Sequence, residues 1–177
     1  MSRKSSGDRG LWATDAIVLP LFTLFFLSGF TGLVYEVAWV RLFTGVFGNT
    51  TYSVTAVLSA FMAGLALGSR LFGRLIDTQR RQLLVYALLE AGIAVSAVLI
   101  TLTVPLLDPI YGFFYKSLNF SNALLTALRF ALSFVLIIIP TILMGGTLPV
   151  IARFFIRNIG QVGARTGILY GLNTLGA

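Results

Sequence analysis

The sequence contains no cysteine, no histidine and only 6 acidic residues among 177. Without cysteine there is no disulfide and no thiolate nucleophile, and without histidine there is no imidazole base. Neither residue is available to bind zinc. Charged residues make up 11% of the chain and hydrophobic residues 57%, which is far from the composition of a soluble domain. The shortage of charge therefore predicts a protein that dissolves in lipid.

Long apolar stretches fill most of the chain. A hydrocarbon core of ~30 Å needs about 20 helical residues at a rise of ~1.5 Å each. The stretches predicted to cross the bilayer lie at residues 17–42, 52–72, 83–107 and 123–156. A further apolar run, residues 166–177, reaches only about 18 Å and predicts an incomplete fifth span. The predicted fold is all-α, a polytopic helical membrane protein with four full transmembrane helices and an incomplete fifth.

Glycine and proline interrupt these stretches. The stretch at 123–156 is too long for one straight crossing, and Pro140, the pair Gly145-Gly146 and Pro149 predict a kink or a break in its second half. Residues 1–11 are polar and are predicted to be a disordered cytoplasmic N-terminus. Residues 12–177 are predicted to form the transmembrane domain.

The basic residues sort by side of the membrane. Ten of the 13 lysines and arginines precede the first span, lie in the last residues of the second span or in the loop after it, or lie in the last residues of the fourth span or after it. The positive-inside rule makes that side cytoplasmic and places the N-terminus inside. Because the positive charge does not gather on one face, we expect a lipid bilayer as partner and no nucleic acid. A partner polypeptide or a continuation of the chain is expected to cover the incomplete last helix.

Small residues recur every four positions in the second span, at Ala56, Ala60, Gly64 and Gly68. This spacing puts them on one helix face, where a second backbone can approach closely. Tight helix packing is the favoured interpretation, and a substrate path is the alternative.

Charges at membrane depth cost a few kcal/mol each and call for partners. Glu36 and Arg129 lie about 9 and 10 Å from the outer ends of their spans, so an ion pair between them is predicted. Glu36 is either this structural partner or a substrate-binding carboxylate. Glu90 has no cation at its depth, and is either protonated or faces a cationic ligand in a wet cavity. Tyr35 and Asn173 are candidates for hydrogen bonds to a ligand or to a neighbouring helix.

No catalytic or nucleotide-binding constellation is present. Gly145-Gly146 does not belong to a phosphate-binding pattern, and no nucleophile stands next to a base. We therefore expect no cofactor and no enzymatic activity from this chain alone.

Several segments together suggest a family. Residues 28–42 read SGFTGLVYEVAWVRL, and further quoted segments are FGNTTY at 47–52, FMAGLALGS at 61–69, LMGGTLP at 143–149 and LYGLNTLGA at 169–177. In combination they resemble the membrane region of the bacterial spermidine-synthase-like multispanning proteins. The resemblance implies a bacterial inner-membrane protein whose helical region is joined to a cytoplasmic aminopropyltransferase-like domain. No position in this chain matches that domain.

A weaker likeness is to the major facilitator transporters. Gly73, Asp77, Arg80 and Arg81 resemble the family's loop after its second helix, but Thr78 replaces a basic residue and Arg80 a glycine. The likeness implies that the helices form a major-facilitator-like half bundle.

These likenesses leave three hypotheses for the function. The chain is the membrane domain of a spermidine-synthase-like protein, with Glu36 and Glu90 as candidate polyamine contacts. Alternatively, it is a half-transporter for a small cation, or a non-catalytic accessory subunit of a larger membrane complex. A polar cavity reaching Glu36 or Glu90 would favour the first two hypotheses, and a dry bundle the third.

Overall fold

The computed structural model describes residues 15–47, 50–107, 109–110, 112–113, 122–156 and 162–177. The elements are α1 (Asp15–Phe47), α2 (Thr50–Ile76), α3 (Gln82–Thr103), the 3-10 turn η1 (Val104–Leu106), α5 (Asn122–Phe155) and α6 (Val162–Gly176). The predicted disorder of residues 1–11 concerns a segment outside the described residues.

Four of these helices are long and apolar enough to cross a membrane. The spans are Val18–Val46, Thr51–Ile76, Gln82–Leu106 and Ala123–Phe155. Large apolar side chains cover the outside of the bundle, Leu19, Met62 and Leu88 among them, each more than 60% exposed. Such a surface suits lipid and not water. The chain is therefore a multi-pass helical membrane protein, and the predicted fold class is confirmed.

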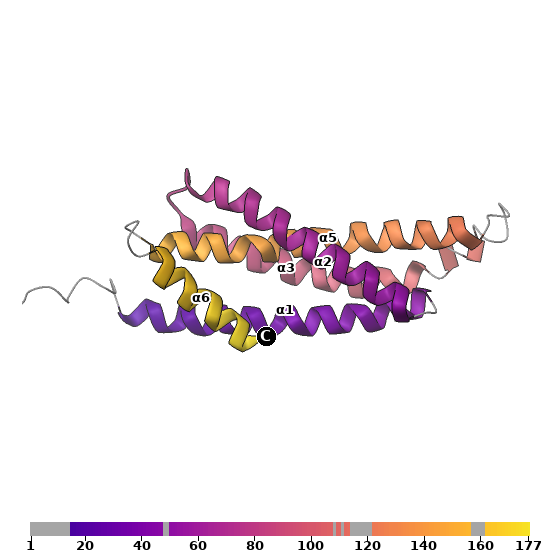
Figure 1. Ribbon diagram of the computed structural model, residues 1–177, viewed down its shortest axis with the longest axis horizontal. Coiled ribbons are helices and arrows are strands. Elements are labelled where there is room, and N and C mark those ends of the chain that lie inside the picture. Colours follow the sequence, from indigo (N-terminus) through magenta and orange to yellow (C-terminus); the bar gives the residue numbers. More distant parts are fainter. Residues whose placement is uncertain (1–14, 48–49, 108, 111, 114–121, 157–161) are drawn as a thin grey trace, which may run out of the picture.

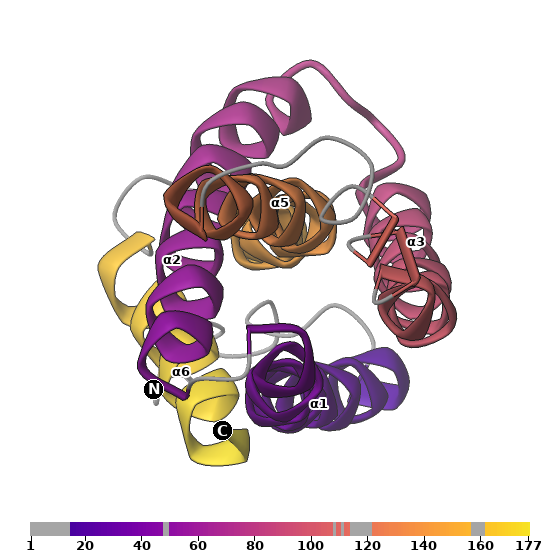
Figure 2. The same cartoon turned by 90° about the vertical axis from the view of Figure 1, so that its right-hand side faces the viewer.

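The helices form two groups. α5 lies between α2 and α3, and its contact with α2 is the most extensive in the molecule (Figure 2). α1 runs along the other side of the bundle, where α6 crosses it obliquely and ends beside its middle (Figure 1). α1 also packs against α2 but touches α3 and α5 only over short stretches. Cavities that could hold a ligand are therefore expected beside α1.

α5 is one continuous helix from Asn122 to Phe155, although it contains Pro140 and Pro149. The continuous helix excludes the break that the prolines predicted as one possibility, and a kink stays a prediction. A proline removes one backbone hydrogen bond, and in membranes nearby hydroxyl groups and neighbouring helices stabilise the freed backbone. Next to Pro140, the buried Thr141 adds a polar contact to the neighbouring helix, since its Oγ1 donates to the Ile137 carbonyl at 2.9 Å and also lies 3.3 Å from the Ala60 carbonyl of α2.

The small residues of α2 face α5. Ala56 and Ala60 are fully buried, and Gly64 and Gly68 are buried as well. A Cβ atom at Gly64 would overlap the Thr141 side chain, and one at Gly68 would overlap backbone atoms of α5. The reverse holds on α5, where a Cβ at Gly145 would overlap the backbone of α2. The two backbones approach so closely that only glycine fits at these points.

α6 crosses α1 at another pair of glycines. A Cβ at Gly29 of α1 would overlap the Asn173 carbonyl, and one at Gly176 of α6 would overlap the Phe26 carbonyl. α6 has 15 residues and begins four positions before the predicted start of the fifth apolar run. At about 22 Å it is too short to span a membrane, as predicted for an incomplete span.

Candidate functional site

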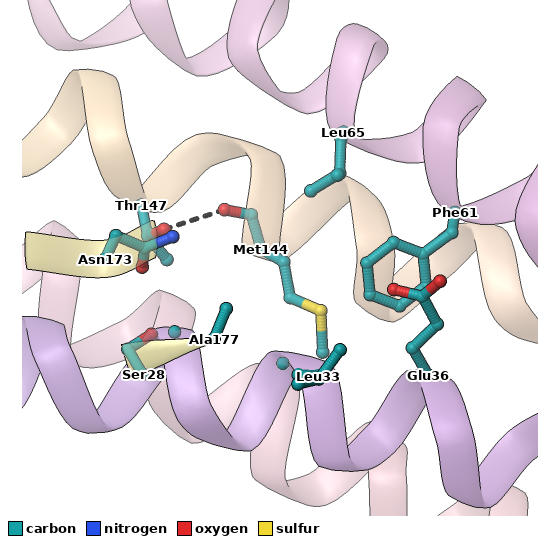
Figure 3. Close-up of a pocket in the computed structure, with 11 residues that line it drawn as sticks. Ser28, Leu33, Glu36, Phe61, Leu65, Met144, Thr147, Asn173 and Ala177 are labelled. Carbon is teal, nitrogen blue, oxygen red and sulfur yellow. Dashed lines mark hydrogen bonds between the residues drawn. The ribbon is translucent and has the colours of Figure 1, made fainter. Parts of the chain in front are cut away.

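A cavity of about 200 Å³ opens beside the middle of α1. Its walls come from four helices that are distant in sequence, and Figure 3 shows how their side chains converge. α1 contributes Ser28, Gly29, Gly32, Leu33 and Glu36; α2 contributes Phe61 and Leu65; α5 contributes Met144 and Thr147; α6 contributes Asn173 and Ala177. We call this the Glu36 pocket.

Four polar side chains stand among the apolar walls of this pocket: Ser28, Glu36, Thr147 and Asn173. The Thr147 hydroxyl donates to the Met144 carbonyl at 2.7 Å, so its lone pairs are left to accept. The amide of Asn173 and the hydroxyl of Ser28 add further hydrogen-bonding groups. One carboxylate surrounded by neutral oxygen acceptors is an arrangement that suits an ammonium ion and not an anion.

Glu36 does not pair with Arg129. Among the described residues the structure records an ion pair between Asp77 and Arg153, and none that involves Glu36. The predicted Glu36–Arg129 pair is therefore wrong. Counting inward from the helix ends assumed that α1 and α5 share their outer boundary. Instead, Glu36 shares its pocket with Met144, which is 15 residues, or about 22 Å, farther along α5 than Arg129.

Glu90 lies in a different cavity. A cleft of about 490 Å³ separates α1 from α3 and is lined mainly by apolar side chains. Ser28 Oγ donates to Glu90 Oε1 at 2.8 Å across this cleft. Ser28 also lines the Glu36 pocket, so the two cavities lie on either side of this one residue. We call the second cavity the Glu90 cleft.

The remaining predicted residues do not join either cavity, apart from Asn173 in the Glu36 pocket. Tyr35 stacks on Trp39, with ring centroids 5.6 Å apart and an interplanar angle of 9°. Trp39 is only 1% exposed and belongs to a core that α1 shares with α2, α3 and α5. Arg129 lies in the first part of α5, seven residues after the helix start.

The loop residues lie at the end of the bundle where α2 ends and α3 begins. Asp77 Oδ1 is 3.5 Å from Arg153 Nε of α5, and both side chains are well exposed. Gly73 packs near Pro149 of α5. Arg80 and Arg81 are exposed in the turn before α3. The segment that resembles the transporter loop therefore contacts α5, through Asp77 and Gly73.

Sequence reasoning assigned no role to several residues of the two cavities. Ser28, Met144 and Thr147 lie in segments that carry the family resemblance but were not identified as site residues. Tyr86 was also overlooked, although it stands one helical turn before Glu90, a spacing that puts both side chains on one face. The i, i+4 spacing was a usable signal for Tyr86, whereas the residues from distant helices required the tertiary structure.

The chemistry available in these cavities is binding. Within the described ranges no group of three or more acidic side chains gathers as it would to hold a metal ion. The cavities offer carboxylates, hydroxyls and an amide, which recognise cations and hydrogen-bond donors. Comparisons with protein-family models, with curated proteins and with solved structures find no match for this chain.

Proposed function

We propose that the chain is the membrane domain of a spermidine-synthase-like protein and that its Glu36 pocket binds a polyamine. The observation that carries the proposal is a carboxylate without a basic partner among the described residues, set in a cavity between four helices. A charge at membrane depth is costly when it is alone. A cationic ligand would supply the missing counter-charge.

The size and shape of the pocket limit the class of ligand that it can bind. Drug-sized molecules occupy pockets of about 300 to 1,000 Å³, and the Glu36 pocket has about 200 Å³. A slender, unbranched cation, or one end of it, suits this volume better than a bulky one. Glu36 would bind an ammonium group, Thr147 and Asn173 would accept further N–H bonds, and Phe61 and Met144 would contact the methylene chain.

The resemblance of the five quoted segments to the spermidine-synthase-like proteins supports the same substrate class. Four of those segments contribute residues to the pocket: Gly29, Gly32 and Glu36 from the first, Phe61 and Leu65 from the third, Thr147 from the fourth and Asn173 from the last. In this proposal the membrane domain anchors or supplies a cytoplasmic aminopropyltransferase-like domain, with the arginine-rich end of the bundle in the cytosol of a bacterium.

The half-transporter remains a second candidate, because the same cavity would serve transport. The accessory-subunit hypothesis predicted a dry bundle, and the Glu36 pocket counts against it. An assay on proteoliposomes distinguishes binding from transport, because only a transporter accumulates labelled spermidine in the lumen.

The test is saturable binding of radiolabelled spermidine to the purified protein in nanodiscs of neutral lipid. We expect Glu36→Gln to weaken binding at least tenfold, because the amide keeps the shape and removes the charge. Asp77→Asn is the matched control, since it removes an exposed carboxylate outside the pocket and should leave affinity unchanged. Equal affinities of the wild type and Glu36→Gln, or no saturable binding by the wild type, would contradict the proposal.

A further inference from the structure

We propose that the Glu90 cleft is a second binding site, for a single-chain amphiphile with a primary amine head and an alkyl tail that enters from the lipid. The amine would lie beside Glu90 and Tyr86, and the tail would lie along the leucines of α1. The site is separate from the Glu36 pocket and takes a different class of molecule.

The first observation is an uncompensated carboxylate. Glu90 accepts a hydrogen bond from Ser28 through one of its oxygens. In the part of the chain that the structure describes, no arginine or lysine forms an ion pair with Glu90. Glu90 is eight residues into α3, which puts it about 12 Å along the span. At such depth a carboxylate calls for a cation.

The second observation is an unsatisfied hydroxyl beside it. Tyr86 lines the same cleft and is only 5% exposed. Among the described residues its buried hydroxyl makes no hydrogen bond of ordinary geometry, while Glu90 and Ser28 are close enough to interact with it. Buried hydroxyl groups are nearly always hydrogen-bonded, so a ligand that bonds to this one would be favoured. An amine head placed between Glu90 and Tyr86 would bond to both.

The third observation is the apolar wall. Leu21, Leu24 and Leu27 of α1 line the cleft from one side, and Leu83 of α3 lines it from the other. Leu24 and Leu27 are about half exposed on the outside of the bundle, so the cleft opens toward lipid. From Leu21 to Thr31 the cleft follows α1 for about 15 Å, which gives room for an alkyl chain.

The depth of Glu90 selects a free amine over a phospholipid. The headgroup of a bilayer lipid stays at the interface, and an ethanolamine headgroup carries a phosphate next to its amine. Drawing that phosphate inward would bring a second negative charge toward Glu90, which is unfavourable in a low-dielectric site. A single-chain amine carries the positive charge alone and can slide to the depth of the carboxylate.

The experiment measures binding of radiolabelled dodecylamine to the full chain in phosphatidylcholine nanodiscs. Unlabelled dodecanol, propylamine and phosphatidylethanolamine serve as competitors. We expect saturable binding, with dodecanol and propylamine competing at least tenfold more weakly than dodecylamine because each lacks one half of the ligand. Equal competition by dodecanol would show a plain apolar slot and overturn the proposal, and effective competition by phosphatidylethanolamine would overturn it in favour of a lipid headgroup.

Variants locate the site. Glu90→Gln should weaken binding at least tenfold and Tyr86→Phe by a few fold, whereas Glu36→Gln should leave it unchanged. Wild-type affinity in a folded Glu90→Gln variant would overturn the proposal.

If Glu90→Gln fails to fold, Ala87→Trp provides the test, because its side chain fills the cleft from an exposed position of α3. Its matched control is Ala91→Trp, an exposed position of α3 that does not line the cleft. Ala87→Trp should abolish binding and Ala91→Trp should not; equal binding by both would contradict the site.

Discussion

The α2–α5 interface and the surroundings of α1 are built in opposite ways. Between α2 and α5, glycines bring the backbones so close that a single added Cβ atom would overlap the opposite helix. α1 is tightly packed only where it crosses α6 at Gly29 and in its core contacts; added Cβ atoms at Gly32 and Gly45 would meet nothing within 4 Å, and two cavities lie along the helix. The difference separates a rigid frame from a region with room for ligands. Both carboxylates that lie within the spans belong to the second region.

The largest expected effect is a loss of stability at the α2–α5 interface, the rigid frame of the bundle. Gly68→Ala places a Cβ against the Ile142 backbone, which cannot rotate away. We expect a loss of about 1–3 kcal/mol in unfolding free energy, as for overpacked cores. The matched control, Gly45→Ala, should be neutral or stabilising by about 0.5–1 kcal/mol, because alanine favours a helix. Reversible unfolding in mixed micelles measures both, and a stable Gly68→Ala variant would show that α2 and α5 are not tightly packed.

A smaller loss is expected at the polar contact within the same frame. Thr141→Val removes a buried hydroxyl that contacts both the Ile137 and the Ala60 carbonyls. The cost should be about 0.5–1.5 kcal/mol. Thr103→Val is the control, since the exposed Thr103 hydroxyl bonds only to Leu99 within its own helix. A similar loss in both variants would mean that the contact to α2 adds nothing.

At α1 a bulky side chain should affect binding and not stability. Gly32→Leu directs its side chain into a position with open space on the wall of the Glu36 pocket. We expect spermidine affinity to fall at least tenfold while unfolding free energy changes by less than about 0.5 kcal/mol. Gly171→Leu, also in open space but outside the pocket, should leave affinity unchanged. A strongly destabilised Gly32→Leu variant would show that α1 is packed as tightly as α2.

The smallest effect is expected at the Asp77–Arg153 ion pair. Both side chains are exposed, at 70% and 46%, so water and salt screen the attraction. Asp77→Asn should cost no more than about 1 kcal/mol. A double-mutant cycle with Arg153→Gln measures the coupling, which should shrink at high salt. A coupling of several kcal/mol would instead make this link a part of the frame.

Much of the fold could be predicted from the sequence, because lipid imposes simple rules. The length of apolar runs identified the four spans, and the short fifth run identified α6. The continuity of α5 could not be predicted, because proline indicated a kink or a break and local sequence does not show how a helix packs on its neighbours. The contact between Thr141 and the Ala60 carbonyl of α2, for example, joins residues 81 positions apart in sequence.

The site was predicted only in part. Glu36, Glu90 and Asn173 stood out because polar groups at membrane depth are unusual. Their assignment to cavities could not be predicted, because it depends on how far α5 is shifted along α1. That shift placed Met144, and not Arg129, at the level of Glu36. Depth counted from the ends of a helix is reliable only where helices share their boundaries.

The central claim is that a water-soluble cation can reach the Glu36 pocket within the spans, and cysteine labelling tests it most directly. The chain has no cysteine of its own, so each introduced thiol reports alone. Leu33→Cys lies in the Glu36 pocket, and Val57→Cys lies in the core, where Val57 is 0% exposed. A water-soluble cationic thiosulfonate reacts only with a hydrated thiolate. In native membranes this reagent should label Leu33→Cys, and spermidine should slow that labelling. It should leave Val57→Cys unlabelled until the protein is denatured. A Leu33→Cys thiol that also reacts only after denaturation would contradict the account.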